Sequence, residues 1–368
     1  MEVELEARGA VAAGDLVVVS GALRAARLVE ARVVDRIAPR RDPDAHAETA
    51  RFARADVGRA LAARAAGLRA IRGWFDAQRF LEVDTPVLVP SPGLDVHLAA
   101  FEVEEGPEER PAFLSTSPEY QMKRLLAGGV PRCFQIAHCF RRGERGARHN
   151  PEFTMLEWYR AFAGVEQVID DTQEVVRAVA RAVAGGLSVE VLGVRVDLAA
   201  PFQRLALGDA FARWADISAD EAIALASEDE TRFFRLLVDA VEPALARLEV
   251  PVFLTDWPAP LASLARVSPR DARVCERFEL YVAGVELCNG FGELTDPIEQ
   301  RRRFEHDRAE RARQGLPVYP VDERFLAALE EGMPPAAGNA LGVDRLIAVC
   351  LGLEDIASTQ SFPVAHLF

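Results

Sequence analysis

Residues 149–159, which read HNPEFTMLEWY, limit what this chain can fold into more than any other segment. The residues just before them, 139–146, read CFRRGERG and indicate the end of a strand followed by a charged loop. Alternate residues of a strand share a face, so Phe153, Glu157 and Tyr159 are predicted to lie on one face. An arginine can hold a phosphate through two hydrogen bonds, and a phenylalanine ring can stack on a purine. The pattern therefore indicates an ATP site built on an antiparallel sheet rather than on a glycine-rich loop.

Three segments together resemble the signature motifs of the class II aminoacyl-tRNA synthetases, in the order in which that family has them. Residues 80–86 resemble motif 1, a long helix and a strand that ends in a proline, and residues 139–159 resemble motif 2. Residues 338–346, GNALGVDRL, resemble motif 3. The resemblance implies an α+β catalytic domain with an antiparallel sheet flanked by helices. The alternative is an ordinary sheet whose polar residues only satisfy one another, and the ordered motifs argue against it.

Composition indicates one large domain with an appendage and no membrane contact. The chain has 368 residues, of which 50% are hydrophobic. It lacks a run of about eighteen apolar residues, and its acidic N-terminus does not resemble a signal peptide. Its five cysteines lack the spacing of a zinc site or a disulfide framework. We therefore expect a cytoplasmic protein.

The chain is predicted to have two parts. Residues 1–50 contain short strand patterns broken by glycines, and residues 40–49 read as a polar linker. About 50 residues are too few for the five-stranded anticodon-binding barrel of the lysyl-tRNA synthetases, so we expect a truncated strand-rich extension. Residues 51–368 then form the catalytic domain, which begins with an amphipathic helix within residues 55–80. By resemblance, this helix and motif 1 form the interface of a homodimer.

Three further elements follow from local patterns. Residues 117–120, SPEY, predict a helix start with a Ser or Thr cap and Pro118 in the first turn. Residues 277–297 alternate in polarity around an Ala-Gly pair, which predicts a hairpin. Residues 298–315 predict a charged helix whose arginines face solvent.

The resemblance implies how ATP is held. Arg141 and Arg345 are the implied catalytic residues: Arg141 holds the α-phosphate, where charge develops during attack, and Arg345 holds the far phosphate. Phe153 is expected to stack on adenine, and the helix that starts near Gly342 adds partial positive charge. The other implied nucleotide-binding residues are Gly143, Glu144, His149, Asn150, Glu286 and Leu287.

One position departs from the family pattern. Class II synthetases have a glutamate two residues after the motif 2 arginine, where it reads the adenine, and this chain has Gly143. Glu144 follows directly. Either Glu144 takes that role or the backbone at Gly143 replaces it, so adenine selectivity is the property affected.

The implied magnesium ligands are two glutamates that lie seven residues apart, Glu286 and Glu293. In lysyl-type enzymes the matching pair faces the nucleotide, and Mg²⁺ suits a few carboxylates together with phosphate oxygens. Two acids that face one cleft are costly unless cations meet them. Bound Mg²⁺ and an amine-bearing substrate would supply those cations.

The implied amino-acid pocket has an acid at each end. By resemblance Glu119 binds an α-type amine, and Tyr159 and Glu293 bind a distant side-chain ammonium. A neutral amino acid would leave a carboxylate buried and unpaired, which favours lysine or a related diamino acid. The other implied pocket residues are Ser117, Pro118 and Ala340.

Ala340 separates two lysyl-type branches. Lysyl-tRNA synthetases have glycine at this position, whereas the ligases that attach lysine to elongation factor P have alanine, which in that family favours (R)-β-lysine over α-lysine. The segments SPEYQMKRLLAGG, HNPEFTMLEWYR, NGFGELTD and ALGVDRL also resemble those ligases. The resemblance implies an enzyme that uses ATP to adenylate lysine or (R)-β-lysine and transfers it to a lysine ε-amine of elongation factor P.

Three other functions remain as alternatives. A compact lysyl-tRNA synthetase paralogue would charge tRNA, but the net charge of −14 argues against a large tRNA footprint. A non-catalytic synthetase-like subunit usually lacks the motif arginines, which this chain keeps. An asparagine synthetase A-like enzyme does not fit the lysyl-type acids. Lys123, the only lysine, either packs beside the active site or reflects compositional bias.

Overall fold

The computed structural model describes residues 3–5, 16–24, 27–38, 57–104 and 111–367. The chain divides into two compact units, Met1–Ala62 and Ala63–Phe368. The described part of the first unit contains a three-stranded sheet in the order β1 (Val3–Leu5), β3 (Arg27–Ala38) and β2 (Leu16–Arg24). Strands therefore occur where the sequence predicts them, and the predicted linker at residues 40–49 lies outside the described residues.

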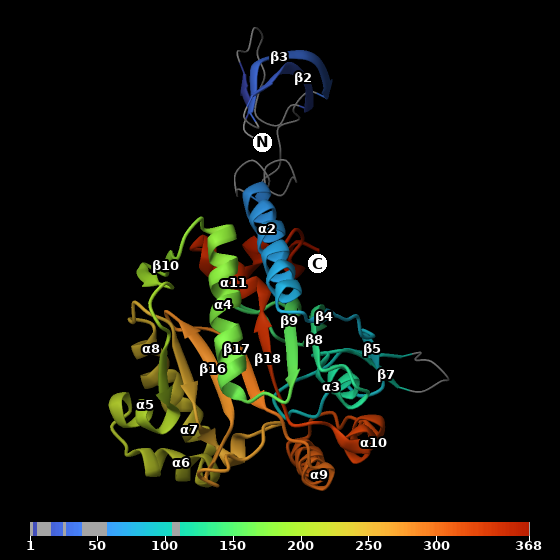
Figure 1. Ribbon diagram of the computed structural model, residues 1–368, viewed down its shortest axis with the longest axis vertical. Helices are drawn as coiled ribbons and strands as arrows, with labels where there is room; N and C mark the ends of the chain where they lie inside the picture. Colours follow the sequence, from blue (N-terminus) through green and yellow to red (C-terminus); the bar gives the residue numbers. More distant parts are fainter. Residues whose placement is uncertain (1–2, 6–15, 25–26, 39–56, 105–110, 368) are drawn as a thin grey trace. The chain divides into compact units, whose positions relative to one another are not determined.

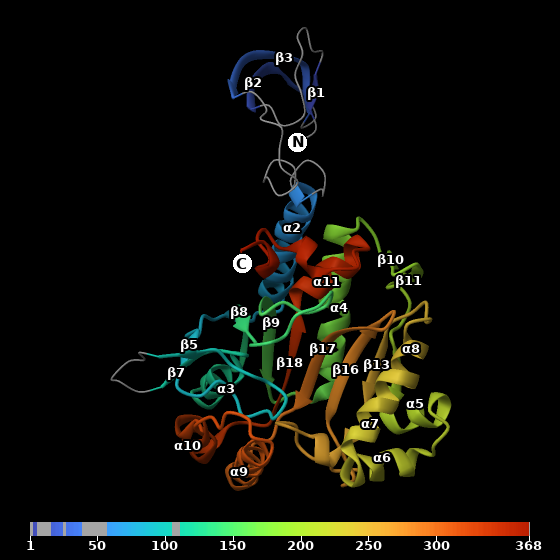
Figure 2. The ribbon, with the colours of Figure 1, turned by 180° about the vertical axis from the view of Figure 1, so that it is seen from behind.

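The second unit is built on one eight-stranded sheet (Figures 1 and 2). Its order is β12 (Gln203–Ala206), β13 (Val252–Thr255), β16 (Arg277–Val282), β17 (Val285–Gly292), β18 (Ala336–Gly342), β9 (Glu152–Ala161), β8 (Arg132–Phe140) and β4 (Leu81–Glu82). The six inner strands are antiparallel, and only the edge strands β12 and β4 pair in parallel. The predicted α+β fold is confirmed, with a mixed sheet in place of a purely antiparallel one.

Strand β9 shows the alternation that its sequence predicts. Leu156 and Trp158, both fully buried, belong to the large apolar core on one face of the sheet. That core includes residues of α4 (Val165–Val183) and α11 (Val343–Leu351), so these helices pack against the sheet. Phe153 and Met155 line a cavity on the opposite face.

The amphipathic helix predicted within residues 55–80 is α2 (Val57–Ala77). Phe75 near its end is fully buried and stacks on Phe134 of β8, with ring centroids 4.4 Å apart. The same ring meets Trp158 edge-on at 5.5 Å. Aromatic contacts of this kind anchor the helix to the two strands that carry motif 2.

The predicted hairpin at residues 277–297 is confirmed as β16 and β17. Its turn residues Ala283 and Gly284 have φ angles of 45° and 73°. A type I′ hairpin turn has positive φ at both central positions, which glycine adopts without steric cost. A Cβ on Gly284 would also lie 2.8 Å from the Cβ of Ala246.

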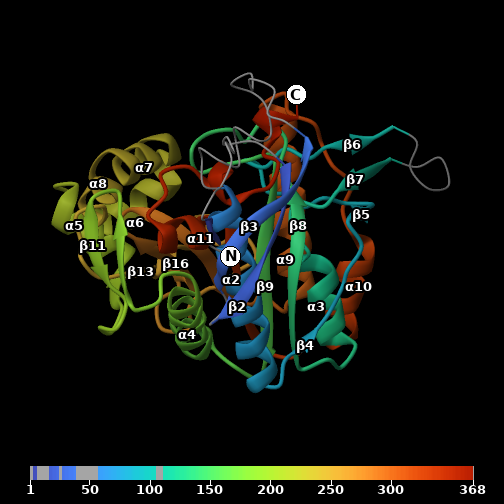
Figure 3. The ribbon, with the colours of Figure 1, turned by 90° about the horizontal axis from the view of Figure 1, so that it is seen from above.

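Helices gather at both ends of the sheet (Figures 1 and 3). At the β8 end lie α3 (Glu119–Ala127) and α10 (Glu323–Gly332), and their rings Tyr120 and Phe325 stack at 4.8 Å. The predicted helix at this point is present, but the predicted Ser or Thr cap is wrong: the N-cap is Pro118, and the Oγ of Ser117 accepts a hydrogen bond from the Glu119 N–H at 3.2 Å.

The remaining helices are α5 (Leu207–Trp214), α6 (Ala219–Glu228), α7 (Glu230–Leu236) and α8 (Glu242–Leu245), beside β13, and α9 (Pro297–Arg313), near α10. The small sheets contain β5 (Leu88–Val89), β7 (Ala112–Leu114) and β6 (Glu102–Val103), then β10 (Ser188–Val191) with β11 (Val194–Asp197), and β14 (Trp257–Pro258) with β15 (Val274–Cys275). All five cysteines are buried and free. Among the helices that the structure describes, none has both the length and the apolar character needed to cross a bilayer.

Candidate active site

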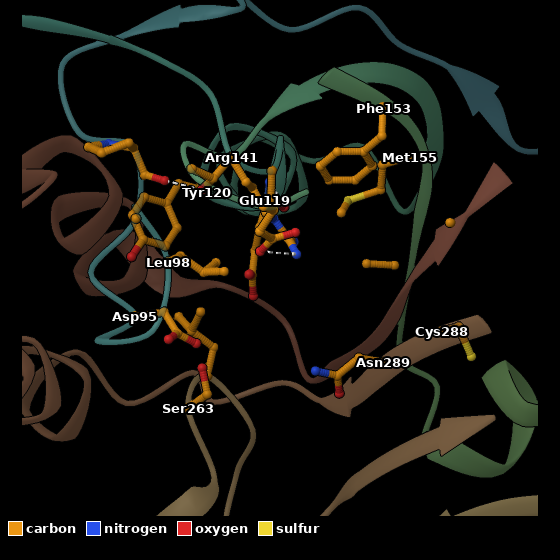
Figure 4. Close-up of a pocket in the computed structure, with 18 of the residues that line it drawn as sticks. Asp95, Leu98, Glu119, Tyr120, Arg141, Phe153, Met155, Ser263, Cys288 and Asn289 are labelled. Atoms are coloured by element: carbon orange, nitrogen blue, oxygen red, sulfur yellow. Dashed lines mark hydrogen bonds and ion pairs between the residues drawn. The ribbon is translucent and has the colours of Figure 1, made fainter. Parts of the chain in front are cut away.

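One cavity of the second unit brings together most of the predicted site residues (Figure 4). Those that line it are Ser117, Glu119, Arg141, Glu144, His149, Asn150, Phe153, Glu286, Leu287, Ala340, Gly342 and Arg345. Those that do not are Pro118, Gly143, Tyr159 and Glu293. The cavity lies on the face of the sheet that carries Phe153 and Met155, and motif 2, motif 3 and the hairpin all contribute side chains to it.

Arg141 follows the last residue of β8 and points at the ring of Phe153. Its guanidinium carbon lies 5.0 Å from the centroid of that ring. Its Nη1 lies 3.7 Å from a carboxylate oxygen of Glu144, and its buried Nε has no hydrogen-bond partner. A half-buried arginine with a free donor can bind an anion such as a phosphate. The guanidinium lies over one face of the Phe153 ring. A purine could stack on this ring only if the guanidinium moved away or if the purine took the other face.

Arg345 lies in the first turn of α11, beside the N-cap residue Gly342. Its Nη1 donates to the backbone oxygen of Glu286 at 3.0 Å and approaches the Glu286 carboxylate at 3.3 Å. Its Nη2 lies 2.8 Å from Nε2 of His149. Burial and then the charge of Arg345 lower the pKa of His149, so the imidazole is neutral and Nε2 accepts the hydrogen bond. The contacts fix both side chains at one end of the cavity.

The loop between β8 and β9 explains the glycine at position 143. Gly143 has a φ of 86°, a left-handed conformation that residues with a Cβ adopt only with strain. Gly143 does not line the cavity, whereas Glu144 does. Of the two alternatives for reading adenine, this placement favours the side chain of Glu144.

Lys123 is not a surface residue but an interior cation. Its side chain is 0% exposed, and its Nζ lies 2.6 Å from Glu119 and 2.5 Å from Glu293. Burial lowers the pKa of Lys123, but the two carboxylates outweigh this effect and raise the pKa above its usual value. The lysine is therefore charged and joins α3 to the loop that follows β17. The Glu119 carboxylate is 17% exposed and lines the cavity, so this buried pair stands directly behind the cavity wall.

Glu157 is a buried carboxylate that sequence reasoning placed on the right face but gave no role. It is 1% exposed and accepts hydrogen bonds from Ser117 Oγ at 2.7 Å and Tyr159 Oη at 2.5 Å. Burial and then the nearby charge of Glu119 raise the pKa of Glu157 to about 8. Tyr159 is 3% exposed and supports this carboxylate instead of lining the cavity.

The prediction that Glu286 and Glu293 face one cleft does not fit their placement. Glu286 lines the cavity with its side chain 40% exposed. Glu293 is 1% exposed, does not line the cavity and is held by Lys123. The reason is that Lys123 of α3, which is distant in sequence, forms an ion pair with Glu293. Glu293 therefore contacts Lys123 behind Glu119, and direct contact of Glu293 with a metal ion or substrate is not supported in this arrangement.

The predicted solvent-facing helix α9 also contributes to the cavity. Gln300, Phe304 and Asp307 line it. Half-buried Arg303 and buried Arg311 donate to backbone oxygens of neighbouring loops, so only part of the arginine run is a solvated face. The sequence contains a pattern that could have predicted this shared face. Residues 300, 304, 307 and 311 are spaced four, three and four apart, as on one face of a helix.

Comparisons with known proteins agree with the geometry. The family of class II tRNA synthetases (D, K and N) matches residues 44–366. An elongation factor P–(R)-β-lysine ligase of Proteus mirabilis is 43% identical over 315 residues, which cover 80% of this chain and 91% of that protein. The corresponding ligase of Vibrio campbellii is 41% identical over 313 residues, 82% of this chain and 95% of that protein. That of Haemophilus influenzae is 42% identical over 312 residues, 83% and 94% respectively. With its three ordered motifs on one mixed, largely antiparallel sheet, the chain belongs to the class II tRNA synthetase family.

Proposed function

We propose that this chain is an ATP-dependent ligase of the cytoplasm that adenylates lysine or (R)-β-lysine and transfers it to the ε-amine of a lysine on elongation factor P. The names of the relatives support the acceptor and the reaction. The observation that carries the proposal is a cavity lined by Arg141, Arg345 and Glu119, with the buried carboxylates of Glu157 and Glu293 packed near Glu119 behind its wall.

The carboxylate end is suited to an amine-bearing amino acid. Glu119, Glu157 and Glu293 surround one cation, Lys123. Burial raises the pKa of Glu293 to about 7 although Lys123 lowers it, and the pKa of Glu157 rises to about 8. Burial is the main cause of both rises, and the single charge of Lys123 does not offset it. A substrate ammonium beside Glu119 would supply further positive charge, whereas a neutral amino acid would not.

The arginine end is suited to ATP. Arg141 has an unpartnered buried donor, and Arg345 sits at the N-terminus of α11, where the helix dipole adds positive charge. In the proposed first step the substrate carboxylate attacks the α-phosphorus of ATP and pyrophosphate leaves. Arg141 would stabilise the charge that develops on the α-phosphate, and Arg345 would hold the far phosphate. No general base is needed, because the carboxylate is already ionised.

The described residues fit a magnesium ion that is held mostly by the nucleotide. No group of three or more histidine, cysteine, aspartate or glutamate side chains among them could hold a metal alone. Mg²⁺ often takes one or two carboxylates together with phosphate oxygens, and Glu286 lines the cavity beside Arg345. When bound there, Mg²⁺ would neutralise phosphate charge.

The choice between lysine isomers is proposed to depend on Ala340. This residue lines the cavity and packs with Phe153 and Met155, close to Arg141. Its methyl group therefore reduces the space beside the adenylation site. A single methyl group changes selectivity by about 1–3 kcal/mol, enough to favour one isomer without excluding the other. We also propose a homodimer formed through α2 and motif 1, and no tRNA partner.

The test is a transfer assay with the purified protein, ATP, Mg²⁺ and either lysine isomer. Elongation factor P of the same organism is the acceptor in one reaction and bulk tRNA in the other. We expect intact mass to show one added lysyl group on elongation factor P and acid-precipitable label to be absent from tRNA. Label on tRNA alone would identify a compact synthetase, and the absence of adenylate would identify a non-catalytic relative.

Neighbouring arginines of the motif 2 loop give a matched control. Arg141→Ala should slow the transfer about 10²- to 10³-fold. Arg142→Ala removes the same charge one residue away, from an exposed side chain that does not line the cavity. Equal loss in both variants would show that general loop charge, and not phosphate binding by Arg141, is needed.

A further inference from the structure

A second polar group lines the cavity at the wall formed by α9 and by the loop of residues 91–98. It consists of Ser91, Asp95, Gln300 and Asp307, which we name the α9 wall. In the view of Figure 4, Asp95 lies across the cavity from Phe153, toward which Arg141 points. The α9 wall is thus separate from the nucleotide end of the cavity.

Helix α9 fixes the geometry of this wall. Gln300, Phe304 and Asp307 lie on one helix face together with Arg311. Arg311 is 1% exposed and donates to the backbone oxygen of Asp95 at 2.7 Å, as well as to two neighbouring carbonyls. The buried guanidinium therefore anchors the loop on the helix and sets the position of the Asp95 side chain.

Two buried oxygens of the α9 wall have no hydrogen-bond partner. Gln300 is 1% exposed, and its Oε1 accepts no hydrogen bond. Ser91 is 2% exposed, and its Oγ is also without a partner. A buried polar atom left unsatisfied is unfavourable, so each in a native structure indicates a missing partner. Both residues line the cavity, so a molecule bound there could supply the missing donors.

The two carboxylates of the α9 wall lack a paired cation. Among the described residues, neither Asp95 nor Asp307 forms an ion pair. Burial and then the charge of Asp95 raise the pKa of Asp307 to about 6, and this effect outweighs the opposing charges of Arg303 and of the nearby histidines 97 and 306. The wall therefore attracts positive charge as well as hydrogen-bond donors.

We propose that Ser91, Asp95, Gln300 and Asp307 bind the ammonium of the acceptor lysine before transfer. This inference rests on the proposed function. An ammonium has one positive charge and three donors, and the α9 wall offers it carboxylates and unpartnered oxygens as acceptors. The nucleotide and the donor amino acid account for the walls at Arg141 and Glu119. The α9 wall therefore remains for the amine of the acceptor lysine. Because Asp95 is exposed, a side chain of another protein can reach this wall.

The experiment separates the two half-reactions in Asp307→Asn. Adenylation is followed by pyrophosphate exchange with lysine or (R)-β-lysine, and transfer is followed by intact mass of elongation factor P. We expect the KM for elongation factor P to rise about 10- to 100-fold, the range for loss of a charged hydrogen bond. The exchange constants should stay within about twofold, which also shows that the variant folds. Gln300→Met, which removes the amide at similar size, should raise the same KM less.

The matched control is Glu305→Gln, which removes the same charge from an exposed position of α9 that does not line the cavity. Equal acceptor KM values for Asp307→Asn and this control would overturn the inference. A raised KM for the donor amino acid in the exchange reaction would also overturn it, because the α9 wall would then belong to the donor. If the unmodified protein forms adenylate but never modifies elongation factor P, the proposed function itself fails, which is a distinct result.

Discussion

Replacing Glu157 by glutamine should stabilise the unliganded protein at alkaline pH while impairing its activity. Glu157 is 1% exposed, and burial and then Glu119 raise its pKa from an ordinary 4.5 to about 8. A pKa difference of one corresponds to about 1.4 kcal/mol, so ionising this side chain in the folded protein costs about 4–5 kcal/mol. Glutamine has nearly the same shape and never ionises.

The sign of the pH dependence follows from where protons bind. Between pH 4.5 and 8 the folded protein keeps the Glu157 proton and the unfolded chain has lost it. The folded state therefore binds more protons, and its stability falls as pH rises through this window. Glutamine lacks this titration, so the stability difference between variant and unmodified protein should grow by about 3–4 kcal/mol from pH 5 to pH 8.5.

The assay is urea unfolding of both proteins at pH 5 and pH 8.5, without ATP or amino acid. The change in the difference between the two free energies of unfolding is the measured quantity, and it cancels groups common to both proteins. A difference that stays constant across this range would refute the reasoning, because Glu157 would then titrate normally. Stability gained together with activity lost is the pattern of a site kept strained for function.

Three further predictions concern single side chains of the site. Arg141→Ala should slow adenylation about 10²- to 10³-fold, since one donor to the developing charge is lost. Pyrophosphate exchange measures this, and an unchanged rate would contradict the assignment. Lys123→Met leaves Glu119 and Glu293 without their cation and should lower the free energy of unfolding by about 3–5 kcal/mol. Urea titration at pH 8 checks it, and an unchanged midpoint would argue against the ion pairs. Ala340→Gly should raise the kcat/KM for α-lysine relative to that for (R)-β-lysine, by a factor of about 10 to 200. The ratio of kcat/KM for the two isomers tests this, and a constant ratio would remove Ala340 from the explanation of selectivity.

Local patterns were enough to predict the strands that hold the site. The alternation in β9 predicted which side chains share a face, and the Ala-Gly pair at residues 283–284 predicted the hairpin turn. Both depend on a few neighbouring residues and on geometry that is the same in every sheet. Arg141, Arg345 and Phe153 therefore lie in the cavity where the motifs indicated.

Contacts between distant segments could not be predicted in this way. No local pattern shows that Lys123 of α3 contacts Glu293 after β17, so the sequence predicted an acid that faces the cleft where the fold buries an ion pair. The position of Asp307 in the cavity wall could not be predicted for a different reason. A helix with many charges reads as solvated, and the face that a charge occupies depends on which loops pack against it.

The burial of the only lysine has a consequence for side reactions. An accessible neutral amine can attack an acyl-adenylate, and the side chains of surface lysines near an active site supply such amines. Here the sole lysine side chain is 0% exposed, and it is held as an ammonium between two carboxylates. The protein thus offers no lysine amine that could attack its own acyl-adenylate. Adenylate that escapes the site would therefore acylate lysines of other proteins but not the lysine of this chain.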